Sequence, residues 1–443
     1  MIFRTESCKM FVLMLVTLSL VPRDTRAQPD TWNFHMEDYK DHPCRRPCEE
    51  NGLPHVCQYD WIVENYFVMS KACHQCPFNL DHCSAPHCIA ADGYAKGIKV
   101  ANRMMPGPAI EVCLGDTIEV TVNNHLESSE GTSIHWHGIL QYGSQFMDGV
   151  AMVTQCPISF NSKFTYRFNA SSAGTHYWHG HAGTQRADGL YGPLIVRQPP
   201  SKEIYHTTYD YDLPEHVITI TDWTIDMMTN RLAKYVHFDY DNKPRLMLIN
   251  GESFGACSMR KDCLIPTTGQ TTAMSALDVA EHVDHCYLYL LQLGDSTSLA
   301  EVKELDRAGK INRTTSQAPL KDTIIIPDGG YTVLRFRADN PGIWLLHCHV
   351  EFHAETGMAL VFQVGTKEQL PKRPKNFPKC GSWKFEGYEE DDGTPASNQP
   401  NITVNVPVPK VEVTCRSNSN SLRTSSIMLM SVTFMAILKS LYF

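Results

Sequence analysis

Short runs in which apolar and polar residues alternate recur along most of the chain, and they constrain its fold more than any other feature. In the runs at 109–124 and 163–170, Val, Ile, Thr, Phe and Tyr recur at alternate positions between Gly, Pro and Asn turns. Such alternation is typical of β-strands with one buried face. Similar runs lie at 193–198, 216–223, 323–327, 331–338, 344–350 and 358–364. The clearest expected helix is 298–310. The sequence therefore predicts a mainly β protein made of β-sandwich domains.

Two groups of these runs have the size of a sandwich domain, and we place them at 91–199 and 276–370, the second one partial. Residues 200–275 open like a further sandwich but lose the strand pattern after about residue 257. We therefore expect only the remnant of a domain and a junction there. A C-terminal extension follows at 371–417.

The N-terminal residues are typical of a secretory signal peptide, which we place at 1–27. Arg4 and Lys9 precede an apolar run, 11–21, that is too short to span a membrane, and cleavage is expected after Ala27. Acceptor triplets for N-glycosylation occur at Asn169, Asn312 and Asn401. Together these features predict a secreted, extracellular glycoprotein.

A cysteine-rich segment, 28–90, follows the expected signal peptide. Cys73 and Cys76 are spaced like zinc ligands, but no second matching pair accompanies them. Disulfide bonds are the better explanation in an exported chain, because an oxidising compartment preserves them. Spacing alone leaves the disulfide pairing open.

The net charge of −9 and the lack of a basic run argue against nucleic acid as a partner. The last residues, 418–443, combine a polar spacer with an apolar tail, an order that resembles the signal for a glycolipid (GPI) anchor. Lys439 interrupts the apolar end. A short hydrophobic anchor and a tail outside the fold are the alternatives, so membrane attachment stays open.

The sequence LLHCHVEFHAETGM at 345–358 concentrates metal-binding side chains. If 344–350 is a strand, His347 and His349 lie on one face and Cys348 lies on the other. Cys348 can then join His353 and Met358 in one site. One Cys, one His and a weak Met are three of the four groups of a blue-copper centre, which needs a second His. The two flanking histidines would serve a different metal cluster, joined to the first through adjacent peptide bonds.

Two further His-x-His pairs occur in the sequences SIHWHG and THYWHGH. The first contains His135 and His137, and the second contains His179 and His181. Imidazole is a good copper ligand, and the three pairs together offer a full set of nitrogen donors. One such pair is weak evidence, because histidines are common on surfaces. Three pairs beside a Cys–His–Met box are better explained by copper than by structural histidines.

In these motifs the chain resembles a multicopper oxidase of the laccase type, and most of all the insect laccases. The resemblance covers nearly all of 40–256 and 276–385. It includes MPGPAIEVC, HWHG, MDGV, VTQCPI, AGTHYWHGH, QRADGLYGPLIVR, PLKDTIIIPDGGYTVLRFRADNPG and HCHVEFHAETGM. It implies cupredoxin-like β-sandwich domains, of which the family has three and this chain lacks most of the middle one. It also implies a type 1 copper that takes electrons from a reductant and a trinuclear cluster that reduces dioxygen to water.

Carried over motif by motif, the resemblance implies ligands for each copper. The type 2 copper would be bound by His135. One type 3 copper would be held by His137, His179 and His349, and the other by His181 and His347. The type 1 copper would be bound by Cys348 and His353, with Met358 as the axial ligand. Asp148 in MDGV matches an acidic position that would assist proton delivery near the cluster.

The fourth ligand motif of the family, His-Pro-x-His-Leu-His-Gly, is matched only by EHVDHCYLYLLQLG. The match makes His282 a type 1 ligand and His285 a type 2 ligand. Tyr287 stands where a type 3 histidine belongs, and a phenol with an ordinary pKa of about 10 is a poor substitute. Cys286, which replaces Leu, is expected to be buried or disulfide-bonded, and the alternative is an additional soft ligand beside the cluster. We therefore expect one type 3 site to be impaired.

These residues predict a copper-dependent oxidoreductase that oxidises diphenols or related small aromatic reductants and reduces dioxygen, with four copper ions per chain in the family. Relatives that oxidise ascorbate or ferrous iron are not distinguished by any residue. One alternative is a secreted copper-binding protein with impaired catalysis, because of Tyr287 and the missing middle domain. Another is a structural surface protein held by the C-terminal tail.

Overall fold

The computed structural model describes residues 39–127, 130–238, 244, 246–253, 280–283, 288–295, 298–312, 320–326, 330–374, 377–378 and 380–381. All of them lie in one compact unit, Asp38–Phe443. No helix among them is long and apolar enough to cross a membrane. His285, Cys286, Tyr287, the predicted signal peptide and the predicted tail lie outside these residues.

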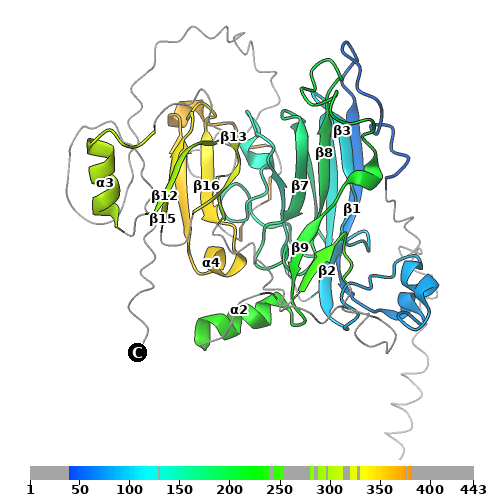
Figure 1. Cartoon of the computed structure of the whole chain (residues 1–443). Coiled ribbons are helices and arrows are strands. Elements are labelled where there is room, and N and C mark those ends of the chain that lie inside the picture. The colour runs from blue at the N-terminus through cyan, green and yellow to red at the C-terminus, as the bar shows by residue number, and fades with distance from the viewer. Residues whose placement is uncertain are drawn as a thin grey trace, which may run out of the picture. The chain divides into compact units, whose positions relative to one another are not determined.

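The first sandwich consists of two four-stranded sheets (Figure 1). One has the order β2-β1-β4-β6, with strands Gly97–Ala101, Val56–Phe67, Thr117–His125 and Lys163–Asn169. The other has the order β3-β8-β7-β5, with strands Ile110–Cys113, Tyr191–Arg197, Gly174–Gly180 and Ile134–His137. The pairs β1–β4 and β3–β8 are parallel, and the other pairs are antiparallel.

Tryptophan side chains fill the space between these sheets. Trp61 of β1 lies 4.3 Å from Trp178 of β7 and 5.8 Å from Trp136 of β5, measured between ring centroids. All three are fully buried. Burial of such large rings is the main stabilising contribution that a sandwich core can make. β1 lies inside the predicted cysteine-rich segment, yet it is a central strand of this sandwich.

The last sandwich contains a four-stranded and a three-stranded sheet. The first has the order β14-β11-β16-β17, with strands Thr323–Ile325, Ala280–Val283, Gly342–Cys348 and Ala359–Val364. The second has the order β13-β12-β15, with strands Leu320–Lys321, Leu288–Asp295 and Gly330–Arg335. Helix α3, Leu299–Arg307, begins at Ser298, whose side chain accepts a hydrogen bond from the Glu301 amide. Helix α4, Glu351–Glu355, follows β16.

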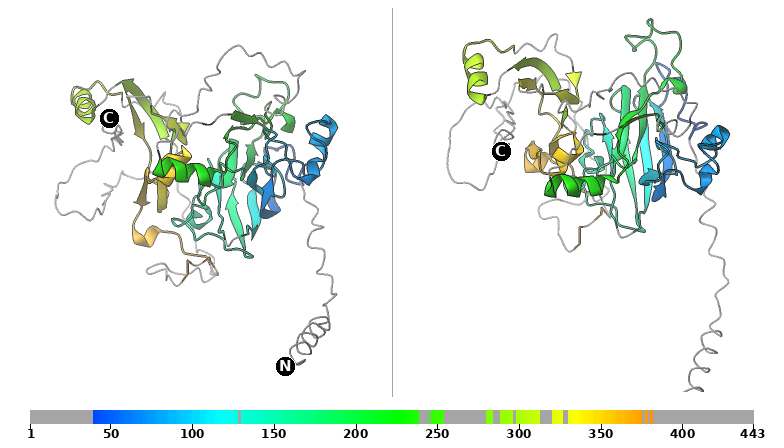
Figure 2. Two further views of the ribbon diagram at one scale, coloured as in Figure 1. Left: turned by 90° about the horizontal axis from the view of Figure 1, so that it is seen from below. Right: turned by 60° about the horizontal axis from the view of Figure 1, so that its bottom comes forward.

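In the sequence between the two sandwiches, the chain forms a pair of antiparallel strands, β9 (Ile220–Trp223) and β10 (Leu246–Ile249), and helix α2 (Met228–His237). Figure 2 shows α2 beside α4, and the Tyr235 ring stacks on that of Phe352 with centroids 5.1 Å apart. Among the described residues, the short 3₁₀ helices are Lys71–Cys73, Leu80–Ser84, Gln145–Met147, Pro214–His216 and Lys367–Gln369. The prediction of a mainly β fold of cupredoxin-like sandwiches is confirmed. The domain boundaries stay predictions.

The prediction of disulfide bonds is confirmed as well. The pairs among the described residues are Cys44–Cys57, Cys48–Cys113, Cys73–Cys88, Cys76–Cys83 and Cys156–Cys380. The last pair joins the first sandwich to the residues that follow the last one. The thiol of Cys348 is buried and takes part in no disulfide.

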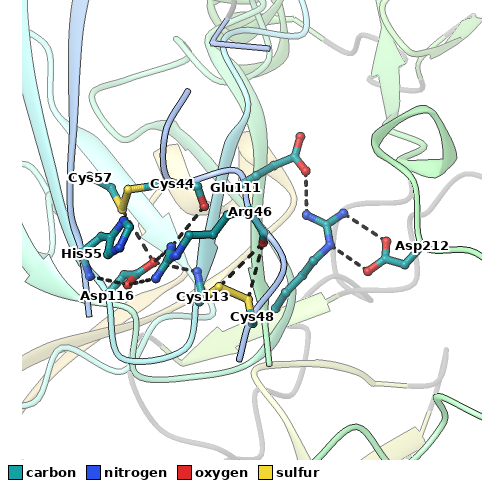
Figure 3. The surroundings of a disulfide bond; sticks show 10 residues. Cys44, Arg46, Cys48, His55, Cys57, Glu111, Cys113, Asp116 and Asp212 are labelled. Carbon is teal, nitrogen blue, oxygen red and sulfur yellow. Dashed lines mark hydrogen bonds and ion pairs between the residues drawn. A yellow bond between two sulfur atoms is a disulfide. The ribbon is translucent and has the colours of Figure 1, made fainter. Parts of the chain in front are cut away.

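A partly buried ion pair accompanies the first of these disulfides (Figure 3). Arg46 donates two hydrogen bonds to the Asp116 carboxylate, at 2.7 and 2.9 Å, and the amides of His55 and Cys113 donate to the same carboxylate. Burial opposes ionisation of Asp116, but these donors outweigh it and lower the pKa of the carboxyl. Asp116 also lies close to Cys44 and Cys57. Because those sulfurs are bonded to each other, this group is structural and holds no metal.

Candidate copper centre

Six histidine rings gather where the two sandwiches meet. Within the first sandwich, the His135 ring lies 5.2 Å from His179 and 5.4 Å from His181, between centroids. Across the boundary, His181 lies 5.2 Å from His347, and His349 lies 5.0 Å from His137. The structure thus brings together all three predicted His-x-His pairs.

Strand alternation explains how the first sandwich presents its histidines. β5 and β7 are antiparallel, with His135 opposite His179 and Trp136 opposite Trp178. Since neighbours along a strand point to opposite faces, the tryptophans enter the sandwich core while the histidines face away from it. His135, His137 and His179 remain almost completely buried there. The last sandwich uses the same geometry, because His347 is in β16 and His349 follows its end.

Main-chain carbonyl groups fix the orientation of several rings. The Nδ1 atoms of His135, His179 and His347 lie 2.9, 2.9 and 3.0 Å from the carbonyl oxygens of Asp148, Gly180 and Cys348. A carbonyl only accepts, so each Nδ1 carries the proton and each Nε2 keeps its lone pair. A hydrogen bond of this kind on the second nitrogen is the usual support for a metal-binding histidine. In His137, by contrast, Nε2 lies 3.1 Å from Thr323 Oγ1.

The donor set fits copper. Ligand atoms of His135, His137 and His179 all lie within 4.8 Å of one another. The Nε2 atom of His179 is buried and has no hydrogen-bond partner among the described residues. Burial, and then the neighbouring His135, Arg186 and His181, lower the pKa of His179 well below its usual range. A buried neutral imidazole with an unused lone pair is costly unless something binds it, and imidazole suits copper.

His349 is held differently from His135, His179 and His347. Its Nδ1 atom lies 3.1 Å from Nη1 of Arg186, and its Nε2 atom lies 3.3 Å from the Tyr177 hydroxyl. A guanidinium only donates, so Nδ1 accepts and the ring proton belongs to Nε2. His349 would therefore bind a metal through Nε2 once that proton has left, and the bonds of Arg186 to the His349 carbonyl and to Glu351 do not depend on that proton.

The predicted type 1 ligands are partly brought together. The Cys348 thiol is buried and lies 3.5 Å from Nδ1 of His353. The main chain of Met358 lies next to that of Cys348, since the Met358 carbonyl accepts a hydrogen bond from the Cys348 amide at 3.0 Å. In the register of β11 and β16, His282 is level with His347, and Glu281 is level with Cys348. The assignment of His282 to the type 1 copper stays a prediction, and so does that of His285.

Asp148 lies beside the candidate type 2 ligand. Its carboxylate Oδ1 is 3.1 Å from Nδ1 of His135, and its side chain is completely buried. The sequence analysis missed four further residues at this centre: Tyr177, Arg186, Thr323 and Glu351. Arg186 stands in the quoted sequence QRADGLYGPLIVR, but no local pattern shows that an arginine will meet a distant loop.

Two cavities adjoin the centre. One, of about 270 Å³, is lined by His179, His181, His347, Cys348 and Met152 among others. The other, of about 300 Å³, lies beside the loop after Cys348 and is lined by Asp222, Met228, Met247, Glu351 and Phe352 among others. Burial raises the pKa of Asp222, although Arg186 opposes this shift.

Comparison with known proteins agrees with this geometry. Residues 83–201 and 289–368 both match the multicopper oxidase family. Laccase-1 of Cryptococcus neoformans var. grubii is 52% identical over 136 residues, which are 30% of this chain and 21% of that protein. The L-ascorbate oxidase of Cucumis sativus is 34% identical over 218 residues, 47% of this chain and 32% of that protein. The matched part thus spans between about a fifth and a third of these relatives' length.

The laccase of Botrytis aclada has the same fold, with a TM-score of 0.54 at 19% identity over 71% of this chain and 88% of that structure. Cupredoxin-like sandwiches and converging histidine pairs define a copper protein. Through these two segments the chain is similar to the multicopper oxidases, and its matched relatives include laccases. The resemblance to insect laccases in particular stays a prediction.

Proposed function

We propose that this protein is a laccase-like oxidase that oxidises small aromatic reductants and reduces dioxygen to water. One observation carries the proposal: Cys348, close to His353, stands between His347 and His349, which face histidines of the first sandwich. Bound copper would supply one-electron oxidation at the Cys348 side and dioxygen reduction at the histidine side, with four ions per chain expected in the family.

The chain's own residues would perform the remaining tasks. His135, His137 and His179 would hold copper in a site that excludes bulk water, because all three are buried. The adjacent peptide bonds of Cys348 connect the two sites covalently. The Asp148 carboxylate, 3.1 Å from His135, would hold a proton at the edge of the cluster.

The cavity beside Phe352 is the proposed place for the reductant. Met228, Met247 and Phe352 give it apolar walls that suit an aromatic ring, and Asp222 offers one carboxyl group to a phenol hydroxyl. The disulfides support a secreted or extracellular location, where such reductants are met together with dioxygen. Attachment to the cell surface through 418–443 remains the second part of this proposal.

The alternative is a copper-binding protein with impaired catalysis, and Tyr287 in place of the expected type 3 histidine favours it. The test is to load the full chain with copper and to measure copper per chain, absorption at about 600 nm and oxygen uptake with hydroquinone. Oxygen uptake is also measured with ascorbate and with ferrous iron, supplied separately, to compare these reductants with hydroquinone. Cys348→Ser serves as the control that removes the absorption band.

The outcomes separate the two functions. Four copper ions per chain with oxygen uptake in hydroquinone support the oxidase. A blue protein that takes up no oxygen with any reductant supports the alternative. A chain that binds no copper contradicts both.

A further inference from the structure

Arg186 of the first sandwich binds the loop after β16, residues 349–351. Nη2 of Arg186 donates to the His349 carbonyl oxygen at 2.9 Å, and Nε donates to Oε2 of Glu351 at 3.0 Å. Nη2 also pairs with the same Glu351 oxygen, and Nη1 contacts Nδ1 of His349. A planar guanidinium can satisfy several acceptors at fixed angles, which a lysine ammonium cannot do.

Arg186 projects from a segment that is itself held firmly. The neighbouring Gln185 is buried and bonds to Thr132 and to the Gly131 carbonyl. Asp188 is buried in an ion pair with Lys96 and accepts a hydrogen bond from the first amide of α2, on Met228. Because the contacts of Gln185 and Asp188 hold the chain on both sides of Arg186, the backbone from which the guanidinium extends is fixed.

Water screens this ion pair only in part. The side chains of Arg186 and Glu351 are 25% and 12% exposed. Burial lowers the pKa of Arg186, but Glu351 and Tyr177 outweigh it, so the net shift is upward. Charge-assisted bonds in such surroundings are stronger than surface pairs.

We propose that Arg186 is a positioning residue that docks the 349–351 loop onto the first sandwich and so closes the histidine cluster. This inference rests on the proposed function. His347 and His349 must meet His181 and His137 across the boundary, whereas Cys348 and His353 belong to the last sandwich alone. Loss of the arginine contacts therefore affects the histidine cluster and spares the Cys348 site.

The test compares Arg186→Gln with Arg186→Lys, Glu351→Gln and a matched control, Arg167→Gln. Arg167 also forms an ion pair, with Glu119, but it is 54% exposed and lies in β6, in the sheet of the first sandwich that does not carry the histidines. Each full-length protein is loaded with copper, and copper per chain and absorption at about 600 nm are measured. Amide hydrogen exchange across 348–358 is measured on the copper-free proteins.

In Arg186→Gln we expect copper per chain to fall by about half or more while the absorption per chain is retained. We expect exchange across 348–358 to quicken by about tenfold or more. For Arg186→Lys and Glu351→Gln we expect copper per chain and exchange rates between those of Arg186→Gln and the natural protein. Arg167→Gln should match the natural protein in both. A merely structural role would lower the absorption and the copper content together.

Unchanged copper content and unchanged exchange in Arg186→Gln would overturn the docking role. So would a parallel loss of the absorption band, because the Cys348 site would then depend on the arginine equally. If the natural protein binds no copper, the proposed function fails, and the exchange measurement alone decides whether Arg186 docks the loop.

Discussion

The ring of His349 stands edge-on to the ring of His137, with centroids 5.0 Å apart and planes at 83°, although the two residues belong to different sandwiches. Between them the Tyr177 ring stacks on His137, 4.5 Å away, and its hydroxyl reaches Nε2 of His349. The candidate histidine cluster is therefore formed jointly by residues of both sandwiches. Among the described residues, the first sandwich contributes four of the six clustered histidines and the last sandwich two. We therefore expect docking of the sandwiches and copper binding to depend on each other.

Removing one buried ligand tests the cluster directly. We expect His179→Ala to weaken copper binding by at least about 100-fold, since its Nε2 is buried and aimed at the shared site. Titration of the copper-free protein with copper, followed by calorimetry, measures the change. His125→Ala, an exposed histidine at the end of β4, is the matched control. Equal affinities for the two variants would contradict the assignment of His179.

The histidine pairs were predictable because their geometry is local. Alternation along a strand separates Cys348 from its two neighbours whatever the rest of the fold does. β1 was missed for a related reason: its alternating residues, including Trp61, stand in a segment whose cysteines dominate the pattern. Local periodicity therefore reveals a strand only where no stronger feature competes with it.

Contacts between distant residues were not predictable in the same way. Arg186 and the His349 carbonyl are 163 positions apart, and nothing around the arginine announces that loop. Helix α2 was missed because its N-cap residue, Met227, makes no side-chain cap. The cap comes instead from Asp188, 40 positions earlier. Such interactions exist only once tertiary structure has formed.

The substitution Tyr287→His tests whether the fourth ligand motif limits catalysis. An imidazole binds copper at neutral pH, whereas a phenol with an ordinary pKa of about 10 stays protonated. We expect copper per chain to rise and oxygen uptake with hydroquinone to increase by at least about tenfold. Tyr289→His, two positions further along, controls for a new histidine nearby. No gain over that control would mean that Tyr287 is not what limits the cluster.

We expect Asp222 to contribute to binding of the reductant and to have no effect on copper binding. We expect Asp222→Asn to raise the KM for hydroquinone by about 3- to 10-fold, the loss of one hydrogen bond to a charged acceptor. Burial raises the pKa of this carboxyl, so the natural protein's KM should fall as the pH rises through that pKa. In the Asn variant this pH dependence should disappear. A KM profile that is the same in both proteins would remove Asp222 from the reductant site.

The Arg46–Asp116 pair should stabilise the first sandwich in a pH-dependent way. The folded-state pKa of Asp116 is lowered, so its contribution is complete above the unfolded value of about 3.9 and is lost as the pH falls through the folded value. We expect Asp116→Asn to reduce the free energy of unfolding by about 1–3 kcal/mol at pH 7, because Arg46 then loses its charged partner. Urea unfolding at pH 7 and at about pH 2 measures this, and the two proteins should converge at the lower pH. Asp212→Asn removes a more exposed partner of Arg197 and should cost less. A deficit in Asp116→Asn that is equal at both pH values would show that the ion pair is not its source.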